Sequence, residues 1–83
     1  MTTTETIKVL LRSTLQLGDR ADHFNSDTPL FGSLPEFDSM AVVAVVTALE
    51  EQFSISIEDD EITADTFATV GSLSQFIERK LAA

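Results

Sequence analysis

Apolar residues near the start of the chain recur at three- and four-residue spacing, as they do along one face of an amphipathic helix. Thr2 and Glu5 have the spacing of a capping box, and Gly18 is placed to end the helix. The inward positions expected from this spacing are Ile7, Leu10, Leu11, Thr14, Leu15 and Leu17. The pattern predicts a first helix between Thr2 and Gly18.

A second apolar stretch begins after Asp38, a residue type that caps helices well. Its inward stripe is expected to consist of Met40, Val43, Val46, Leu49 and Phe53. The valines within residues 42–46 favour a strand because they are branched at Cβ. The cap before them and the helix-favouring residues 48–52 after them favour a helix, which we expect here.

A third helix is predicted after Thr69, whose hydroxyl can cap it. The inward positions of this helix are Val70, Leu73, Phe76, Ile77 and Leu81. Arg79 and Lys80 fall near its C-terminal end, where positive charge complements the helix dipole.

The connections between these helices contain apolar residues that can reach a core. Residues 19–37 are rich in turn-forming residues, so we expect a long loop with one short helical turn. Its candidate tethers are Phe24, Leu30, Phe31, Leu34 and Phe37. Residues 53–57 alternate like a strand but have no partner strand, so they are expected to form an extended link that buries Ile55 and Ile57.

A short helical segment is expected in the acidic residues 59–65, with Ile62 and Phe67 as its apolar contacts. Together these elements predict one all-α domain over residues 1–83. The expected architecture is a bundle of three main helices and one short helix, with a long first loop.

Charge is unevenly distributed along the chain. Fourteen Asp and Glu residues against five Lys and Arg residues give a net charge of -9. Twelve of the fourteen acidic residues lie in residues 21–78, where the chain has no Lys or Arg. This argues against nucleic acid and anionic membrane surfaces as partners, because both would repel the protein. Two interpretations stay open, a solvated surface and a docking surface for basic partners.

No targeting or membrane-spanning segment is expected. The first residues carry no basic leader, and the longest apolar run covers only the seven residues 40–46. A helix that spans a bilayer needs about 20 apolar residues. We therefore expect a monomeric protein in the cytoplasm.

Enzymatic and metal-binding roles find little support in the residue types. The chain has no cysteine, and its single histidine, His23, lies in a predicted loop. The residues around Ser39 lack the glycines of a nucleophile elbow. The acidic residues 58–61 do not have the spacing of a calcium-binding loop. We expect neither catalysis nor a metal site.

The residues that open the second helix are the strongest candidates for chemistry. Asp38 is expected to cap the helix, which places Ser39 at its first position with an exposed hydroxyl. A phosphate esterified to that hydroxyl would meet unsatisfied amides and the positive end of the helix dipole. Met40 is expected to point to the buried side. The simpler interpretation is that these residues only cap a helix.

The sequence resembles acyl carrier proteins over about residues 5–81. The similarity lies in the order and spacing of Asp38-Ser39-Met40, Leu49-Glu50-Glu51-Gln52-Phe53, the Ile55/Ile57 link and Phe67-Ala68-Thr69-Val70-Gly71-Ser72-Leu73. The resemblance implies a four-helix carrier whose Ser39 receives a 4′-phosphopantetheine arm from a phosphopantetheinyl transferase. The thiol of that arm would hold acyl or aminoacyl groups as thioesters, so the chain would be a carrier and not an enzyme.

The resemblance also implies protein partners. Asp38, Glu50 and Glu51 match positions that meet basic residues of the transferase and of client enzymes, such as acyl-activating ligases, acyltransferases and synthases. The chain departs from carriers of fatty acid synthesis at Ala41, Val42 and Ala44, where acidic residues are common. This departure favours a specialised stand-alone carrier. The alternative from the residues alone is an unmodified acidic helical adaptor that binds a basic protein.

Overall fold

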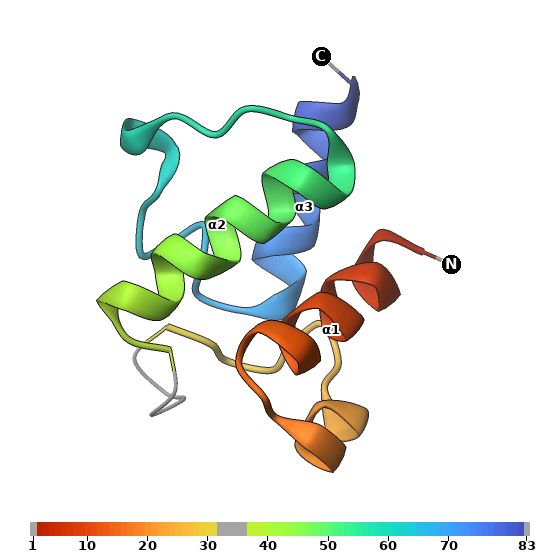
Figure 1. The fold of residues 1–83 in the computed structure, drawn as a ribbon. Coiled ribbons are helices and arrows are strands. Elements are labelled where there is room, and N and C mark those ends of the chain that lie inside the picture. The colour runs from red at the N-terminus through yellow and green to blue at the C-terminus, as the bar shows by residue number, and fades with distance from the viewer. Residues whose placement is uncertain (1, 32–36, 83) are drawn as a thin grey trace.

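The computed structural model describes residues 2–31 and 37–82, which form an α-helical bundle (Figure 1). Its main helices are α1 (Thr3–Thr14), α2 (Ser39–Phe53) and α3 (Val70–Ala82). Two short 3-10 helices, η1 (Gly18–His23) and η2 (Asp59–Glu61), lie in the connections. In the described ranges the only β-type pairing is an isolated bridge between Pro29 and Thr69. The predicted all-α architecture is confirmed.

The α1 helix begins as its sequence predicts but ends earlier. The Oγ1 atom of Thr2 accepts a hydrogen bond from the amide of Glu5 at 3.1 Å. At the other end Gln16 takes a left-handed conformation, with φ of 56°, and the amide of Leu17 donates to the carbonyl of Arg12. This is the Schellman arrangement of a helix end, with Gln16 in the position predicted for Gly18. The prediction was wrong about the residue: Gly18 also has a positive φ, of 60°, but it is the first residue of η1.

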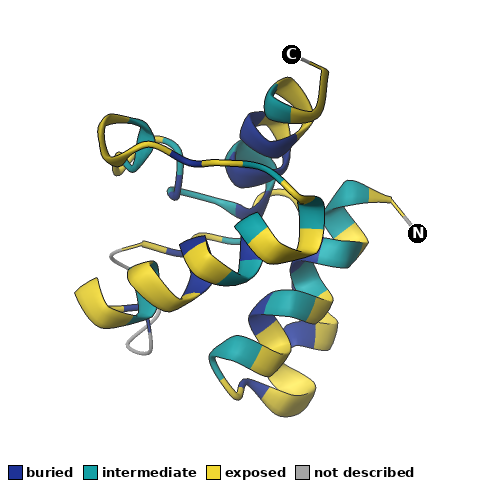
Figure 2. Cartoon of the chain, turned by 45° about the horizontal axis from the view of Figure 1, so that its top comes forward, coloured by how far each residue is buried: buried dark blue, intermediate teal, exposed yellow. Residues whose placement is uncertain are grey.

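The α2 helix buries only part of the predicted stripe: Val46 and Leu49 are buried as expected, and Phe53 packs against the core while partly exposed. Val45, Val46 and Leu49 lie in the core, whereas Met40 is 82% exposed and Val43 is 66% exposed. Figure 2 shows the outer face of α2 as a largely exposed surface. The prediction failed for Met40 and Val43 because α2 is apolar on most of its circumference, so periodicity alone does not select the buried face.

The core lies where α1 contacts both α2 and α3. Its buried apolar residues are Ile7, Leu11, Leu17, Ala21, Phe24, Leu30, Phe37, Val45, Val46, Leu49, Ile57, Phe67, Val70, Leu73, Phe76 and Ile77. The predicted burial of Ile57 is confirmed, and Ile55 packs against the cluster while partly exposed. Leu81, in the last turn of α3, is 48% exposed, contrary to the prediction.

The long first connection is tethered as predicted, with one difference. Phe24, Leu30 and Phe37 are buried, but Phe31 is 46% exposed, and Leu34 lies outside the described residues. The amides of Leu30 and Phe31 donate to the carbonyls of Ala68 and Phe67, at 2.8 and 3.0 Å. These bonds hold the loop against the segment before α3. The short helical turn predicted within the loop is η1.

The start of α3 is capped and closely packed. The Oγ1 atom of Thr69 accepts from the amide of Ser72, and the Oγ atom of Ser72 accepts from the amide of Thr69, both at 3.0 Å. The predicted cap at Thr69 is therefore confirmed. The amide of Gly71 donates to the carbonyl of Ser26 at 2.8 Å. A Cβ atom at Gly71 would lie 2.8 Å from that same oxygen, so glycine permits this close approach.

Candidate functional site

Ser39 is the first residue of α2, and its side chain is exposed. Asp38 precedes it in an extended conformation and caps the helix, since its Oδ1 atom accepts from the amide of Ala41 at 2.8 Å. The first amides of a helix have no partner within the helix, and the helix dipole is positive there. The predicted cap and the predicted exposure of Ser39 are both confirmed.

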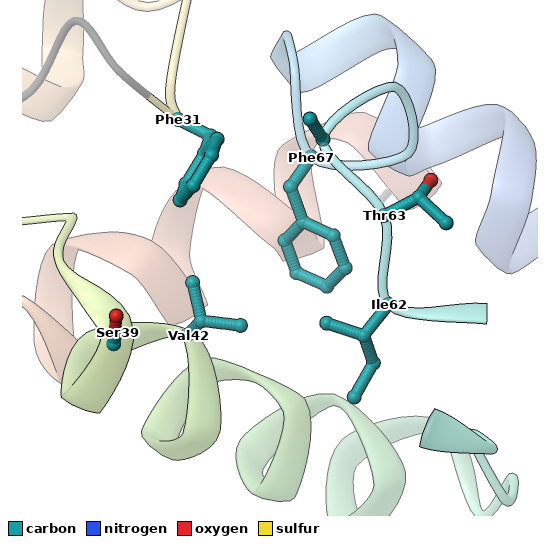
Figure 3. Close-up of a pocket in the computed structure, with 7 residues that line it drawn as sticks. Phe31, Ser39, Val42, Ile62, Thr63 and Phe67 are labelled. Atoms are coloured by element: carbon teal, nitrogen blue, oxygen red, sulfur yellow. The ribbon is translucent and has the colours of Figure 1, made fainter. Parts of the chain in front are cut away.

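A small cavity lies beside Ser39 (Figure 3). Its volume is about 220 Å³. The residues that line it are Phe31, Ser39, Val42, Ile62, Thr63, Ala64 and Phe67. Figure 3 shows Ser39 and Val42 on α2 across the cavity from Phe31, Phe67 and Ile62. The lining is mainly apolar, so the cavity favours an apolar group over a charged one.

Aromatic contacts fix the chain just before Ser39. The ring of Phe37 lies edge-on to the ring of Phe31, with centroids 6.4 Å apart, and is tilted against the ring of Phe67, with centroids 6.0 Å apart. Phe37 is buried and precedes Asp38 directly. Such ring pairs stabilise a fold by more than their buried area alone would. They therefore hold Phe37 in place directly before Asp38, the residue that caps α2.

Met40 does not lie where the sequence predicted. Its side chain is 82% exposed and stands next to Ser39 on the outside of the bundle. The prediction of a buried Met40 is therefore wrong. The consequence is an exposed apolar side chain on the residue that follows Ser39.

Glu50 and Glu51 lie at the far end of α2 from Ser39. A rise of 1.5 Å per residue places Glu51 about 18 Å from Ser39 along the helix axis. Glu51 is exposed, whereas Glu50 is partly buried and its Oε2 atom accepts from the amide of Ile57 at 2.8 Å. The predicted residues thus extend along one helix, and Glu50 also supports the link that follows α2.

Glu61 is a charged residue near the cavity that the sequence did not single out. Its Oε1 atom accepts from the amide of Glu58 and from Nζ of Lys80, each at 2.9 Å. The amide of Glu58, and then the ammonium of Lys80, hold the pKa of the Glu61 carboxyl below its ordinary value. Sequence reasoning missed this pair because nothing local relates two residues 19 positions apart.

Two absences hold for residues 2–31 and 37–82, the part of the chain that the structure describes. Among them, no three His, Cys, Asp or Glu side chains form a group that could hold a metal ion. No helix formed by residues 2–31 or 37–82 has the length and apolar character needed to cross a membrane.

Comparison with known proteins assigns the chain to a family. A family model described as "Phosphopantetheine attachment site" matches residues 5–77. The solution NMR structure of a holo acyl carrier protein from Nitrosomonas europaea is 48% identical, with a TM-score of 0.92 and full coverage of both chains. The chain belongs to the acyl carrier protein family.

Curated acyl carrier proteins from three other bacteria are also similar. The one from Sulfurovum sp. (strain NBC37-1) is 43% identical over 63 residues, which cover 76% of this chain and 80% of that protein. The one from Wolinella succinogenes is 51% identical over 41 residues, 49% of this chain and 51% of that protein. The one from Exiguobacterium sp. is 46% identical over 44 residues, 53% of each chain.

Membership in the acyl carrier protein family fits a carrier and not a catalyst. The family model and the holo neighbour support a covalently attached 4′-phosphopantetheine prosthetic group. The predictions of carrier function and of this cofactor are confirmed. The alternative of an unmodified adaptor gains no support from these comparisons.

Proposed function

We propose that Ser39 is the residue to which 4′-phosphopantetheine is attached, and that the chain carries acyl or aminoacyl groups on that arm. The observation that carries this proposal is the exposed hydroxyl of Ser39 at the capped start of α2. Ser39 also lies within the residues matched by the phosphopantetheine attachment model. The arm supplies a thiol, which the chain itself lacks because it has no cysteine.

The residues around Ser39 fit such a group. The phosphate of the arm is anionic, and the first amides of α2 and the positive end of its dipole favour an anion beside Ser39. Asp38 satisfies the amide of Ala41 and so holds the first turn in place. The apolar lining contributed by Val42, Ile62 and Phe67 offers the attached group a recess next to its point of attachment.

The test is intact-mass analysis of the purified chain after incubation with a phosphopantetheinyl transferase and coenzyme A. We expect the mass to increase by one phosphopantetheinyl group. Ser39→Ala should abolish the increase while melting like the parent protein, because it removes one exposed hydroxyl. Ser13→Ala, which removes an exposed hydroxyl from α1, is the matched control and should be modified normally. Modification that survives Ser39→Ala would disprove the assignment.

We propose further that the transferase and the acyl-activating ligases, acyltransferases or synthases served by this carrier dock against α2. The support is its position, since Met40 lies beside Ser39 and Glu51 is exposed farther along the same helix. Basic residues of a partner would be attracted to Asp38 and Glu51. Glu50 is less accessible to such a contact, because it is partly buried and one of its oxygens accepts a hydrogen bond from the amide of Ile57.

Charge reversal tests this docking proposal. Glu51→Lys should raise the KM of the transferase for the carrier, because it replaces an attractive charge on α2 with a repulsive one. Asp27→Lys makes the same change in net charge at an exposed residue outside α2 and serves as the control. Equal effects of the two variants would show that only net charge matters.

We also propose that the chain acts as a monomer in the cytoplasm, where coenzyme A is available to supply the arm. Its net charge of -9 supports the monomer, because copies of the chain repel one another. Sedimentation equilibrium at low and moderate salt would test this. A dimer that persists at low salt would contradict the monomer.

A further inference from the structure

An ion pair joins η2 to α3 near the cavity. Nζ of Lys80 donates to both carboxylate oxygens of Glu61, at 2.9 Å to Oε1 and 3.2 Å to Oε2. The two side chains are only 24% and 30% exposed, so water and salt screen this pair less than a fully exposed one. The described residues also contain a looser pair, between Arg12 and Asp22 at 3.7 Å, whose side chains are at least half exposed.

The carboxylate of Glu61 also organises the chain that leads into the cavity wall. Its Oε1 atom accepts from the amide of Glu58, and the amide of Glu61 donates in return to the carbonyl of Glu58, each at 2.9 Å. Ile62 and Thr63 follow directly and line the cavity. Their amides donate to the carbonyls of Asp59 and Glu61, each at 3.1 Å. The position of this wall therefore depends on where Glu61 is held.

The other end of the same connection is held separately. The Oε2 atom of Glu50 on α2 accepts from the amide of Ile57 at 2.8 Å, and Ile57 is buried. The connection is thus bound to α2 at Ile57 and to α3 at Glu61. Of these two contacts, the one between Glu61 and Lys80 is nearer in sequence to Ile62 and Thr63, which line the cavity.

We propose that Glu61 and Lys80 are positioning residues for the cavity beside Ser39, which hold Ile62 and Thr63 in place as its wall. The consequence for the carrier rests on the proposed function: the ion pair between Glu61 and Lys80 sets how readily the cavity beside Ser39 opens. A purely stabilising surface ion pair would instead lower the stability of the whole domain when broken, without a particular effect on the cavity.

The experiment uses the unmodified protein, so its outcome does not depend on the assignment of Ser39. Lys80→Met removes the charge and keeps an unbranched apolar side chain. Arg79→Met removes the same charge from an exposed neighbour on α3 and is the control. Glu61→Gln removes the negative charge but keeps an oxygen that can accept from the amide of Glu58.

The first measurement is amide hydrogen exchange in each variant. In Lys80→Met and Glu61→Gln, we expect exchange at Ile62, Thr63 and Phe67 to accelerate roughly two- to fivefold relative to the amide of Leu11 in α1. Arg79→Met should leave this ratio unchanged. The double variant Glu61→Gln/Lys80→Met should exchange no faster than the single variants, because both remove the same interaction.

The second measurement uses xenon as an apolar probe of the cavity. Xenon occupies preformed apolar cavities, so we expect it to shift the methyl resonances of Val42 and Ile62 in the parent protein and in Arg79→Met. The shifts should shrink in Lys80→Met and recover in Lys80→Arg, which restores a positive charge. Uniform acceleration of exchange along the chain, equal effects in Arg79→Met, or undiminished xenon shifts in Lys80→Met would each overturn the proposal. None of these results bears on whether Ser39→Ala abolishes modification, so this proposal and the assignment of Ser39 can fail independently.

Discussion

Asp38 caps α2 with one hydrogen bond, so replacing it should loosen the turn that carries Ser39. In the parent protein the Oδ1 atom of Asp38 lies 2.8 Å from the amide nitrogen of Ala41. Asp38→Ala removes this acceptor, and loss of a helix cap costs about 0.5–2 kcal/mol. The site is exposed and water can replace the lost bond, so we expect a loss of about 1 kcal/mol.

Thermal unfolding followed by circular dichroism measures this effect. For a domain of this size, about 1 kcal/mol corresponds to a decrease in Tm of roughly 4–8 °C. Asp38→Asn is the matched variant, because its amide oxygen can still accept from Ala41 while the charge is lost. Its Tm should fall by less, since only the interaction with the helix dipole is weakened, by about 0.3–1 kcal/mol.

The same variants link the cap to the proposed modification of Ser39. If the first turn of α2 frays in Asp38→Ala, the rate of transfer measured as kcat/KM should fall further than in Asp38→Asn. An unchanged Tm in Asp38→Ala would refute the capping argument. Equal losses of Tm in both variants would mean that the charge of Asp38, and not its hydrogen bond, stabilises the start of α2.

Three further predictions concern the bundle. Gly71→Ala should destabilise the fold by about 1–3 kcal/mol in urea unfolding, because the new Cβ atom would lie 2.8 Å from the carbonyl oxygen of Ser26. Helix propensity alone predicts that alanine would stabilise α3, and that result would contradict the close approach of Gly71 to Ser26. Leu49→Ala should lower the free energy of unfolding by about 2–5 kcal/mol because Leu49 is fully buried, whereas Met40→Ala should change it by no more than about 0.5 kcal/mol. Equal losses in the two variants would contradict the exposed position of Met40. The pKa of Glu61 is lowered in the folded protein, so its ionised form adds stability above the ordinary value of 4.5, and this stability is lost as pH falls through the lowered value. The difference in unfolding free energy between the parent and Glu61→Gln should therefore be constant at neutral pH and shrink in acid, while the neighbouring acidic residues titrate in both proteins; a difference independent of pH would refute this.

Much of the helical organisation could be predicted because it depends on residues close together in the sequence. The caps at Thr2, Asp38 and Thr69 each use an acceptor three residues before the donating amide. The exposed position of Ser39 follows directly from the cap at Asp38. The burial of Ile57 could be predicted because residues 53–57 alternate between apolar and polar side chains, which point to opposite sides of an extended chain.

The orientation of α2 could not be predicted in the same way. A helix that is apolar nearly all round offers several faces of similar hydrophobicity, and contact with α1 decides which one is buried. That choice placed Val45 in the core and Met40 on the surface beside Ser39. The exposed apolar side chain at the site is therefore a result of helix packing.

By itself, the amino-acid sequence determined the helices, their caps and the serine at the start of α2, because hydrogen bonds and side-chain spacing within one turn specify them. Only the tertiary structure decided the cavity beside Ser39, which requires Phe31, Val42 and Ile62 from separate segments to converge. It also decided the pairing of Glu61 with Lys80 across 19 residues. Such contacts depend on how whole elements pack, and no local pattern encodes the distances between them.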